Sequence, residues 1–164
     1  MTEIDPASEK RLTGVDFPIL VPATTRWADN DMFGHLNNAV YYQLFDTAIN
    51  GWLINTTGIN VLSAPYVGVV AESGCRFYRE IGFPRPVTVG LRVMRLGRSS
   101  VSYQLGIIDA EISSATAQPV AAVGHWVHVY IDRGSRLSTP IPEQLKPTLR
   151  SALTESPIVT NWGA

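Results

Sequence analysis

The chain has 164 residues, of which 45% are hydrophobic and 16% are charged, and its formal net charge is −1 at pH 7. This length predicts one domain, with enough core to fold without disulfides or a structural metal. The 13 basic and 14 acidic residues nearly cancel, and no basic run exceeds two residues. We therefore expect no nucleic acid or anionic membrane as a partner.

The cysteine count and the start of the chain bear on the compartment. Cys75 is the only cysteine, which rules out an internal disulfide and a zinc site built from cysteines. The first 14 residues are polar and lack the apolar core of a signal peptide. No apolar run approaches the ~20 residues that a membrane helix needs. We expect a cytoplasmic protein without a cofactor or metal.

The first half of the chain predicts an arm, a strand and a long helix. Residues 1–17 are expected to form a disordered or loosely docked N-terminal arm. A strand is expected from Ile19 to Trp27, and Pro18 and Pro22 place it at a sheet edge. A helix is expected from about Ala39 to Asn55, because its polar residues recur at spacings of three and four in an apolar segment. Only a narrow polar stripe remains, so most of the helix surface must be covered.

Four β segments follow the helix, and a linker with a short C-terminal helix ends the chain. Alternating apolar residues predict the strands at Tyr66–Tyr78, Val87–Leu96, Val101–Ile107 and Val120–Ile131. One apolar helix against one antiparallel sheet is an α+β layer pair. We expect a single domain over residues 18–140, followed by the C-terminal helix and tail at 141–164. An open sheet edge remains, and a second copy of the chain is expected to cover it.

Polar residues gather between the first strand and the helix. Two carboxylates, one histidine and two asparagines fall within ten residues, namely Asp29, Asp31, His35, Asn37 and Asn38. Gly34 and the two asparagines are turn and cap residues, so the cluster is expected in a loop that enters the helix N-terminus. Asn38 is the predicted N-cap. The free N–H groups of a helix N-terminus suit a developing oxyanion, and the whole arrangement indicates acyl chemistry.

Three motifs occur in order along the chain. The first is D-x-D-x-x-G-H-x-N-N, preceded by Arg26 and followed by an aromatic-rich helix. The second is R-x-G-R-S-S at residues 95–100, and the third is G-x-x-V-x-V-x-I-D at residues 124–132. With these motifs, residues 18–145 resemble the hotdog-fold acyl-CoA thioesterases of the 4-hydroxybenzoyl-CoA thioesterase type. The resemblance implies an antiparallel sheet wrapped around one central helix, a homodimer or homotetramer, an acyl-CoA substrate and active sites between subunits.

The resemblance also implies roles for individual residues. Asp31 would attack the thioester or activate water, and Gly34 and His35 would help to form the acyl pocket. Backbone amides at the helix start, near Asn38 to Tyr41, would polarise the thioester carbonyl. The catalytic candidates are Asp31, His35 and Asn37. The substrate-binding candidates are Gly34, Asn38, Tyr41, Tyr42, Arg95, Arg98 and Ser99.

The residues of the second motif and of the helix each have an ordinary structural alternative. Arg95, Arg98 and Ser99 suit the phosphates of CoA, but they equally suit a solvated hairpin tip. Four helix aromatics are candidates to line an acyl tunnel, although aromatics on an apolar helix more often belong to the core, namely Tyr41, Tyr42, Phe45 and Trp52. Asp29 is more simply a turn cap that pairs with Arg26.

Other carboxylates and other functions stay open. Asp46 on the helix is a rival to Asp31, and Glu72 faces a pocket, solvent or an interface. A module that binds acyl-CoA without turnover is one alternative, although it would not need a carboxylate at the carbonyl. A hydratase of the same fold is less favoured, because its Asp and His are spaced five apart, whereas Asp31 and His35 are four apart. His125 and His128 fall on opposite strand faces and make a poor metal pair.

Overall fold

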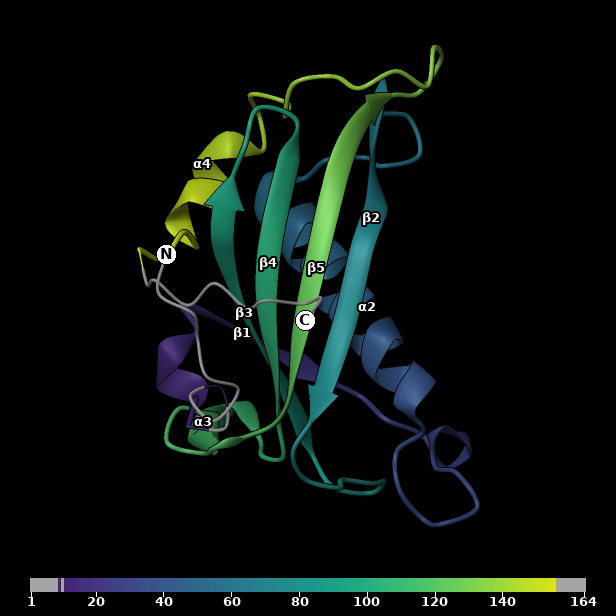
Figure 1. Ribbon diagram of the computed structural model, residues 1–164, viewed down its shortest axis with the longest axis vertical. Coiled ribbons are helices and arrows are strands. Elements are labelled where there is room, and N and C mark those ends of the chain that lie inside the picture. Colours follow the sequence, from purple (N-terminus) through teal and green to yellow (C-terminus); the bar gives the residue numbers. More distant parts are fainter. Residues whose placement is uncertain (1–8, 10, 156–164) are drawn as a thin grey trace.

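The structure is a computed structural model, and it describes residue 9 and residues 11–155. Five antiparallel strands form one sheet in the order β1-β3-β4-β5-β2, and one long helix lies against it (Figure 1). This arrangement confirms the predicted α+β hotdog fold. The elements are η1 (Gly14–Asp16), β1 (Ile19–Ala23), η2 (Trp27–Asp29), α2 (Asn38–Thr57), β2 (Tyr66–Phe77), β3 (Val87–Leu96), β4 (Ser100–Ile108), α3 (Ile112–Ala115), β5 (Val120–Asp132) and α4 (Lys146–Ser151).

Most element boundaries agree with the sequence, and two of them differ for clear reasons. β1 ends at Ala23 and not at Trp27, because the chain turns into η2, whose start at Arg26 is capped by the Asp29 carboxylate. α2 continues to Thr57, where Gly58 takes a left-handed conformation with φ of 69° and its N–H donates to the Ile54 carbonyl. Glycine adopts this conformation without strain, and it ends the helix.

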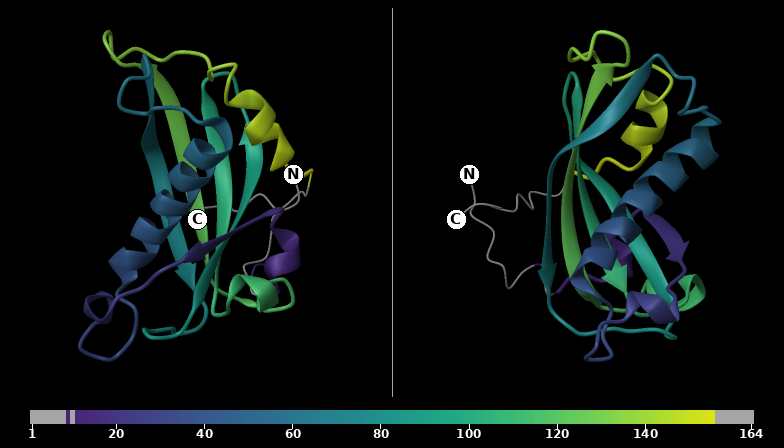
Figure 2. Two further views of the ribbon diagram at one scale, coloured as in Figure 1. Left: turned by 180° about the vertical axis from the view of Figure 1, so that it is seen from behind. Right: turned by 90° about the vertical axis from the view of Figure 1, so that its right-hand side faces the viewer.

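The central helix packs on the sheet through a close contact in its middle. α2 lies diagonally across one face of the sheet (Figure 2). Phe45 is fully buried, and a Cβ atom on Gly124 of β5 would lie 2.5 Å from the Phe45 ring. The absence of a side chain at Gly124 therefore lets the helix approach the sheet. Phe45 and Trp52 both belong to the main hydrophobic core, as the structural alternative for these two aromatics predicts.

Part of the opposite face of the sheet is covered by the described part of the N-terminal arm. Leu12 and Phe17 are buried there in a second core cluster, and the Phe17 ring fits over two strand glycines that leave room for it, Gly90 and Gly106. Residues 11–17 are therefore packed on the sheet and not loosely docked. The rest of the predicted arm, residues 1–8 and 10, lies outside the described residues.

The C-terminal segment is also joined to the core. Leu149 of α4 is fully buried, and the Val93 N–H of β3 donates to the Ala152 carbonyl at 2.8 Å. The division of the chain at residues 17 and 140 stays a prediction.

No helix in the described part of the chain is long and apolar enough to cross a membrane.

β2 forms one outer edge of the sheet, and its pattern differs from the predicted simple alternation. Gly68 and Phe77 both face α2, since a Cβ atom at Gly68 would contact His128 and Tyr130, and the Phe77 ring contacts a helix tyrosine. Residues nine apart share a strand face only where the alternation is interrupted. The interruption is a bulge between Val70 and Glu72. Bulges are common at sheet edges and re-aim the side chains beyond them.

Candidate active site

The Asp31 side chain closes the loop that precedes α2. Its Oδ1 atom accepts hydrogen bonds from the backbone N–H groups of Phe33 at 2.8 Å and His35 at 3.2 Å. The Asp31 N–H in turn donates to the His35 carbonyl at 2.7 Å, and Gly34 takes the positive φ of 81° that this tight loop requires. Within the described chain, Oδ2 accepts no hydrogen bond. One carboxylate oxygen is thus fixed, and the other is open.

The Asp31 loop is held by the segment that follows β2. The Leu36 N–H donates to the Ile81 carbonyl at 2.7 Å, and Asn30 Oδ1 accepts the Phe83 N–H at 3.0 Å. A Cβ atom at Gly82 would lie 2.8 Å from the Gly34 carbonyl oxygen, so the two segments are in tight contact. Asn30 positions the loop, and sequence reasoning missed it. Its partner is 53 residues away, so no local pattern could have identified it.

Asp29 has the structural role that was expected for it. Its carboxylate is buried and accepts hydrogen bonds from Arg26 Nη2 at 2.7 Å, Nε at 3.1 Å and the Arg26 N–H at 2.7 Å. Hydrogen bonding to Arg26 lowers the pKa of Asp29 below its ordinary value. Asp29 therefore stabilises the turn before the loop, and Asp31 is the carboxylate with an open oxygen.

The helix start is capped one residue earlier than predicted. Asn37 Oδ1 accepts the Ala39 N–H at 2.9 Å, so Asn37 is the N-cap and Asn38 is the first helical residue. Either asparagine could cap a helix, and the hydrogen bond from the Asn37 N–H to the Asp29 carbonyl at 2.8 Å fixes the position. The Val40 N–H also bonds to the Asn37 carbonyl. The Asn38 N–H is the amide left without an acceptor in this first turn of the described helix.

These groups border a surface pocket of about 570 Å³. It lies between the Asp31 loop, the first turn of α2 and the segment after β2. Its lining residues are Asp31, His35, Leu36, Asn38, Tyr41, Phe77, Tyr78, Arg79 and Glu80. The pocket therefore contains Asp31, His35, Asn38 and Tyr41 from the predicted site, and adds residues at positions 77–80 that the sequence did not indicate.

Three side chains shape the polarity of this pocket. His35 Nε2 lies 3.2 Å from Glu80 Oε2. Tyr41 is buried, contacts Phe77 edge-on with ring centroids 4.9 Å apart, and burial raises its pKa to about 12. Its hydroxyl therefore stays protonated at neutral pH. Arg79 Nη1 is 2.9 Å from Asp109 Oδ2, and this ion pair keeps the Arg79 guanidinium beside the pocket.

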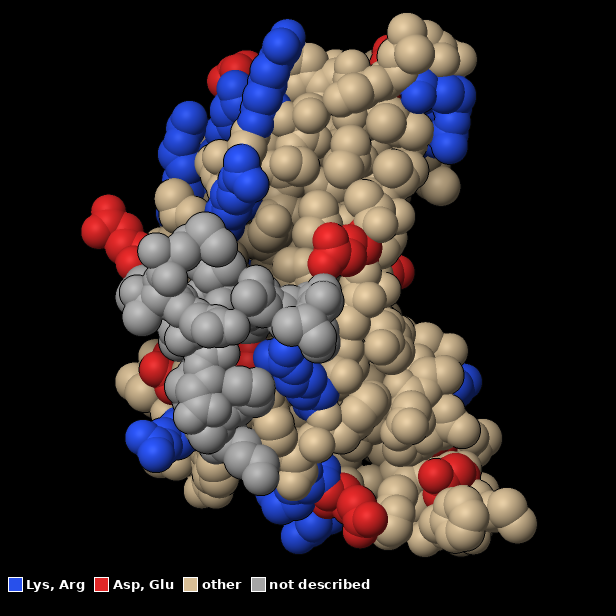
Figure 3. All heavy atoms as spheres, in the orientation of Figure 1, with Lys and Arg blue, Asp and Glu red and all other residues tan. Residues whose placement is uncertain are grey.

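Other predicted site residues lie elsewhere in the chain. Tyr42 is turned toward Trp126 of β5, with ring centroids 6.5 Å apart. Arg95, Arg98 and Ser99 lie at or beside the turn from β3 to β4, at the far end of the sheet from the Asp31 loop. The loop follows β1, whose last residue, Ala23, pairs with residue 87 at the start of β3. Arg95 is eight residues further along β3, so it lies about 26 Å from this end of the sheet. Lys and Arg side chains gather over this far end, beside α4 (Figure 3).

The two late histidines point to opposite faces of the sheet, as expected. His125 Nε2 lies 3.1 Å from Glu72 Oε1. His128 faces α2, where its Nε2 accepts a hydrogen bond from Trp126 Nε1. Among residues 9 and 11–155, no group of three or more His, Cys, Asp or Glu side chains is arranged to bind a metal ion.

Comparison with known proteins supplies the family. A family model described as the thioesterase-like superfamily matches residues 25–149. This chain belongs to the thioesterase-like superfamily. The match begins just before the Asp31 loop and extends into α4, so it includes the whole pocket described above.

Several solved structures are similar to this chain in sequence and fold. The PA5185 protein of Pseudomonas aeruginosa is 36% identical, with a TM-score of 0.79 over 85% of this chain and 94% of its own. The PA2801 protein of the same organism is 27% identical, with a TM-score of 0.68 over 80% and 95%. A thioesterase from Thermus thermophilus, solved with coenzyme A and zinc, is 29% identical, with a TM-score of 0.63 over 83% and 95%. No functionally curated protein sequence matches the chain.

Proposed function

We propose that this protein hydrolyses the thioester of an acyl-CoA to a free acid and CoA. The observation that carries the proposal is the Asp31 carboxylate, whose Oδ1 is fixed by two backbone N–H groups while Oδ2 is open at the pocket. A carboxylate is a suitable nucleophile or general base for acyl transfer when its geometry is fixed in advance.

The reaction follows from the groups at the pocket. Asp31 Oδ2 attacks the carbonyl carbon, or it removes a proton from the water molecule that attacks. The negative charge that develops on the carbonyl oxygen is stabilised by the free Asn38 N–H and by the positive end of α2, and such a donor contributes about 10²–10³ in rate in other hydrolases. The thiolate of CoA then leaves. In the nucleophilic route, water cleaves the resulting anhydride and regenerates Asp31.

The remaining candidate residues have supporting roles in this proposal. His35 lies beside Glu80 in the same pocket as Asp31, and Asn38 and Tyr41 shape its entrance. Gly34 allows the tight Asp31 loop, and Asn37 positions the helix start through its cap. The Thermus thermophilus relative with bound coenzyme A supports CoA as the carrier. A cytoplasmic location is part of the same proposal.

A homodimer, alone or within a tetramer, is also part of the proposal, and β2 supplies the contact. This strand has 12 residues at a sheet edge and is exposed at its centre, from Val70 to Ser73. No strand in the described part of the chain pairs with its outer edge, whose N–H and C=O groups are suited to pairing with a second strand. A two-fold axis pairs two identical strands in antiparallel orientation. The Tyr66 end of one strand then lies beside the Phe77 end of the other. Each Asp31 pocket is thereby brought next to the far end of the partner, where Arg95, Arg98 and Ser99 are closer than they are within one chain.

The test is thiol release from a panel of acyl-CoAs by wild type and by Asp31→Asn. Asparagine keeps an Oδ1 that accepts the Phe33 and His35 N–H groups, so the loop is retained and the charge is removed. We expect kcat to fall by roughly 10²–10⁴-fold, with the melting temperature and the size in solution unchanged.

Asp46→Asn is the matched control, because Asp46 is an exposed carboxylate on α2. Full activity of Asp31→Asn together with loss in Asp46→Asn would move the reacting carboxylate to the helix. Stoichiometric acyl-CoA binding by wild type without thiol release would favour a binding module. Loss of the conjugated absorbance of an enoyl-CoA would favour a hydratase.

A further inference from the structure

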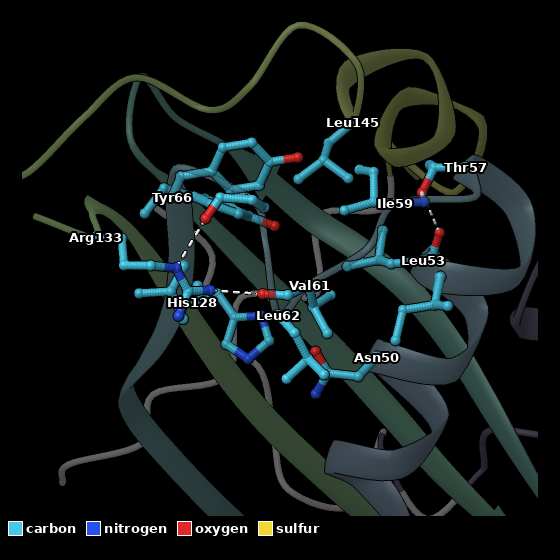
Figure 4. Close-up of a pocket in the computed structure, with 15 residues that line it drawn as sticks. Asn50, Leu53, Thr57, Ile59, Val61, Leu62, Tyr66, His128, Arg133 and Leu145 are labelled. Carbon is cyan, nitrogen blue, oxygen red and sulfur yellow. Dashed lines mark hydrogen bonds between the residues drawn. The ribbon is translucent and has the colours of Figure 1, made fainter.

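A second pocket lies at the other end of α2 from the Asp31 loop. It has a volume of about 350 Å³ and is enclosed by the last turns of α2, the segment at 59–64, the start of β2 and the end of β5 (Figure 4). Its lining is mostly apolar and includes Asn50, Leu53, Tyr66, Gly68, His128 and Tyr130. We call it the His128 pocket. Asn50 is 13 residues beyond the N-cap of α2, so this pocket is about 20 Å from the Asp31 loop of the same chain.

The His128 side chain, which lines this pocket, carries a buried donor without a partner in the described chain. His128 is 2% exposed, and its Nε2 accepts the Trp126 Nε1–H at 3.0 Å. An indole nitrogen only donates, so the imidazole proton must be on Nδ1. Burial lowers the pKa of His128, which keeps the ring neutral with this one proton. Within the described chain, Nδ1 has no hydrogen-bond partner. Buried donors rarely lack an acceptor, so this one indicates a ligand oxygen.

Gly68 keeps the space in front of this donor free. A Cβ atom at Gly68 would lie 3.6 Å from His128 Nδ1 and 3.4 Å from the Tyr130 ring. A Cβ atom alone would make ordinary contacts at these distances, but a larger side chain would fill the space beside the imidazole. A glycine inside a strand often marks such a close approach.

The one charged side chain of the described pocket lining is largely engaged with backbone carbonyls. Arg133 is the one charged side chain among the described lining residues. Its Nε donates to the Ala64 carbonyl at 2.8 Å, its Nη2 donates to the Val61 carbonyl, and its N–H donates to the Pro65 carbonyl at 2.8 Å. Arg133 therefore fastens residues 61–65 over the pocket. The ligand group that enters should be compact, apolar and uncharged, with one acceptor oxygen.

We propose that the His128 pocket receives the far end of the acyl group, and that His128 Nδ1–H donates to a ketone, ether or hydroxyl oxygen there. This inference rests on the proposed function and names its substrate class, an acyl-CoA whose acyl group is compact and ends in an uncharged oxygen function. The thioester is presented to Asp31 of the partner subunit. Antiparallel pairing of two β2 strands brings the Tyr66 end, which borders the His128 pocket, beside the Phe77 end, which borders the Asp31 pocket.

The first test compares three acyl groups of six carbons, namely hexanoyl-CoA, 5-oxohexanoyl-CoA and adipoyl-CoA. We expect wild type to favour the 5-oxo substrate over hexanoyl-CoA by about tenfold in kcat/KM, because hexanoyl-CoA leaves the donor unpaired. Adipoyl-CoA should be the poorest, because its carboxylate would lose water among mostly apolar side chains, beside an Arg133 that is already bonded to backbone carbonyls. His128→Phe should abolish the preference, and His128→Gln, which can both accept from Trp126 and donate, should restore it. An equal preference in wild type and His128→Phe would overturn the assignment.

A second test fills the His128 pocket and determines whether it acts with Asp31 of the same chain or of the partner subunit. Gly68→Val should lower activity on all three substrates, while Gly51→Val, a matched change with open space around the new Cβ atom, should not. The Gly68→Val and Asp31→Asn proteins are then mixed, and their dimers are dissociated and allowed to reassociate. Half of the dimers are mixed, and each mixed dimer has one site with both parts intact, so about a quarter of wild-type activity should return. No recovery would show that the pocket does not serve the partner's Asp31.

A third measurement separates this inference from the proposed function. The ¹⁵N resonance of His128 Nδ1 is followed while hexan-2-one is added to the wild-type protein, with Gly68→Val as the control. A shift in wild type alone is expected, and it needs no catalysis. An unchanged resonance would overturn the ligand assignment even if the protein is a thioesterase. Absence of thiol release with an intact shift would overturn the proposed function alone.

Discussion

The two ends of α2 carry polar groups in opposite circumstances. At the N-terminal end, the Asp31 loop is open to solvent, and its own backbone satisfies one carboxylate oxygen. At the C-terminal end, His128 is almost fully buried, and one of its ring nitrogens has no partner in the described chain. Near water, a polar group is easily solvated and discriminates little between ligands. A buried donor discriminates strongly, because a ligand without an acceptor leaves it unpaired. The first end is suited to chemistry and the second to selection.

The largest expected effect comes from the middle of the helix, on which both ends depend. Phe45→Ala removes a fully buried ring that packs over Gly124, and it should lower the free energy of unfolding by about 3–5 kcal/mol. Urea denaturation measures the change. Because one helix positions both pockets, thiol release and the preference for the 5-oxo substrate should weaken together.

Phe33→Ala is the control for this change, because the Phe33 side chain is 75% exposed in the Asp31 loop. Its effect on the free energy of unfolding should stay within about 0.5 kcal/mol. Equal losses for the two variants would mean that Phe45 does not anchor the helix. Loss of thiol release with a retained substrate preference would mean that the two ends are positioned independently.

A smaller effect is expected at the buried end. His128→Phe leaves the Trp126 N–H without its acceptor and should lower the free energy of unfolding by about 1–3 kcal/mol at pH 7, measured by denaturation. His128→Gln keeps an acceptor and should lose less. A loss in His128→Gln as large as that in His128→Phe would contradict the hydrogen bond as the source of stability.

The same residue gives the stability a pH dependence with a definite sign. Burial lowers the pKa of folded His128 below its ordinary 6.5, so the unfolded chain takes up the proton first as the pH falls. The contribution is fully present above pH 6.5 and is lost as the pH falls toward the folded pKa. Wild type should therefore lose stability below pH 6.5 more steeply than His128→Gln. His125, whose pKa burial also lowers, should keep some slope in the variant.

The two ends of α2 also differ in how far the sequence predicts them. Period-two alternation located β2 to β5 to within one or two residues, because alternation reports a local, two-faced environment. It could not locate the bulge between Val70 and Glu72, which is set by pairing with β5. The Asp31 loop could be predicted from the sequence because its glycine, caps and carboxylate are neighbours along the chain.

The His128 pocket could not be predicted from the sequence in that way. The spacing of His125 and His128 argues against a metal pair, but it carries no information on the role of His128 as a hydrogen-bond donor. The role depends on Trp126 fixing the tautomer and on Gly68 leaving the space in front, and Gly68 is 60 residues earlier in the chain. Tautomer and open space are properties of the packed structure.

The smallest expected effect lies at the exposed end and tests the corrected cap. Asn37→Ala removes the acceptor for the Ala39 N–H and should lower the free energy of unfolding by about 1 kcal/mol, or the melting temperature by about 2–4 °C. Asn38→Ala, its matched neighbour, removes an exposed side chain from the first helical position and should change stability by less than about 0.5 kcal/mol. The reverse order would place the cap at Asn38. That result would also remove the argument for a free Asn38 N–H, since the oxyanion donor in this first turn is defined by which asparagine caps the helix.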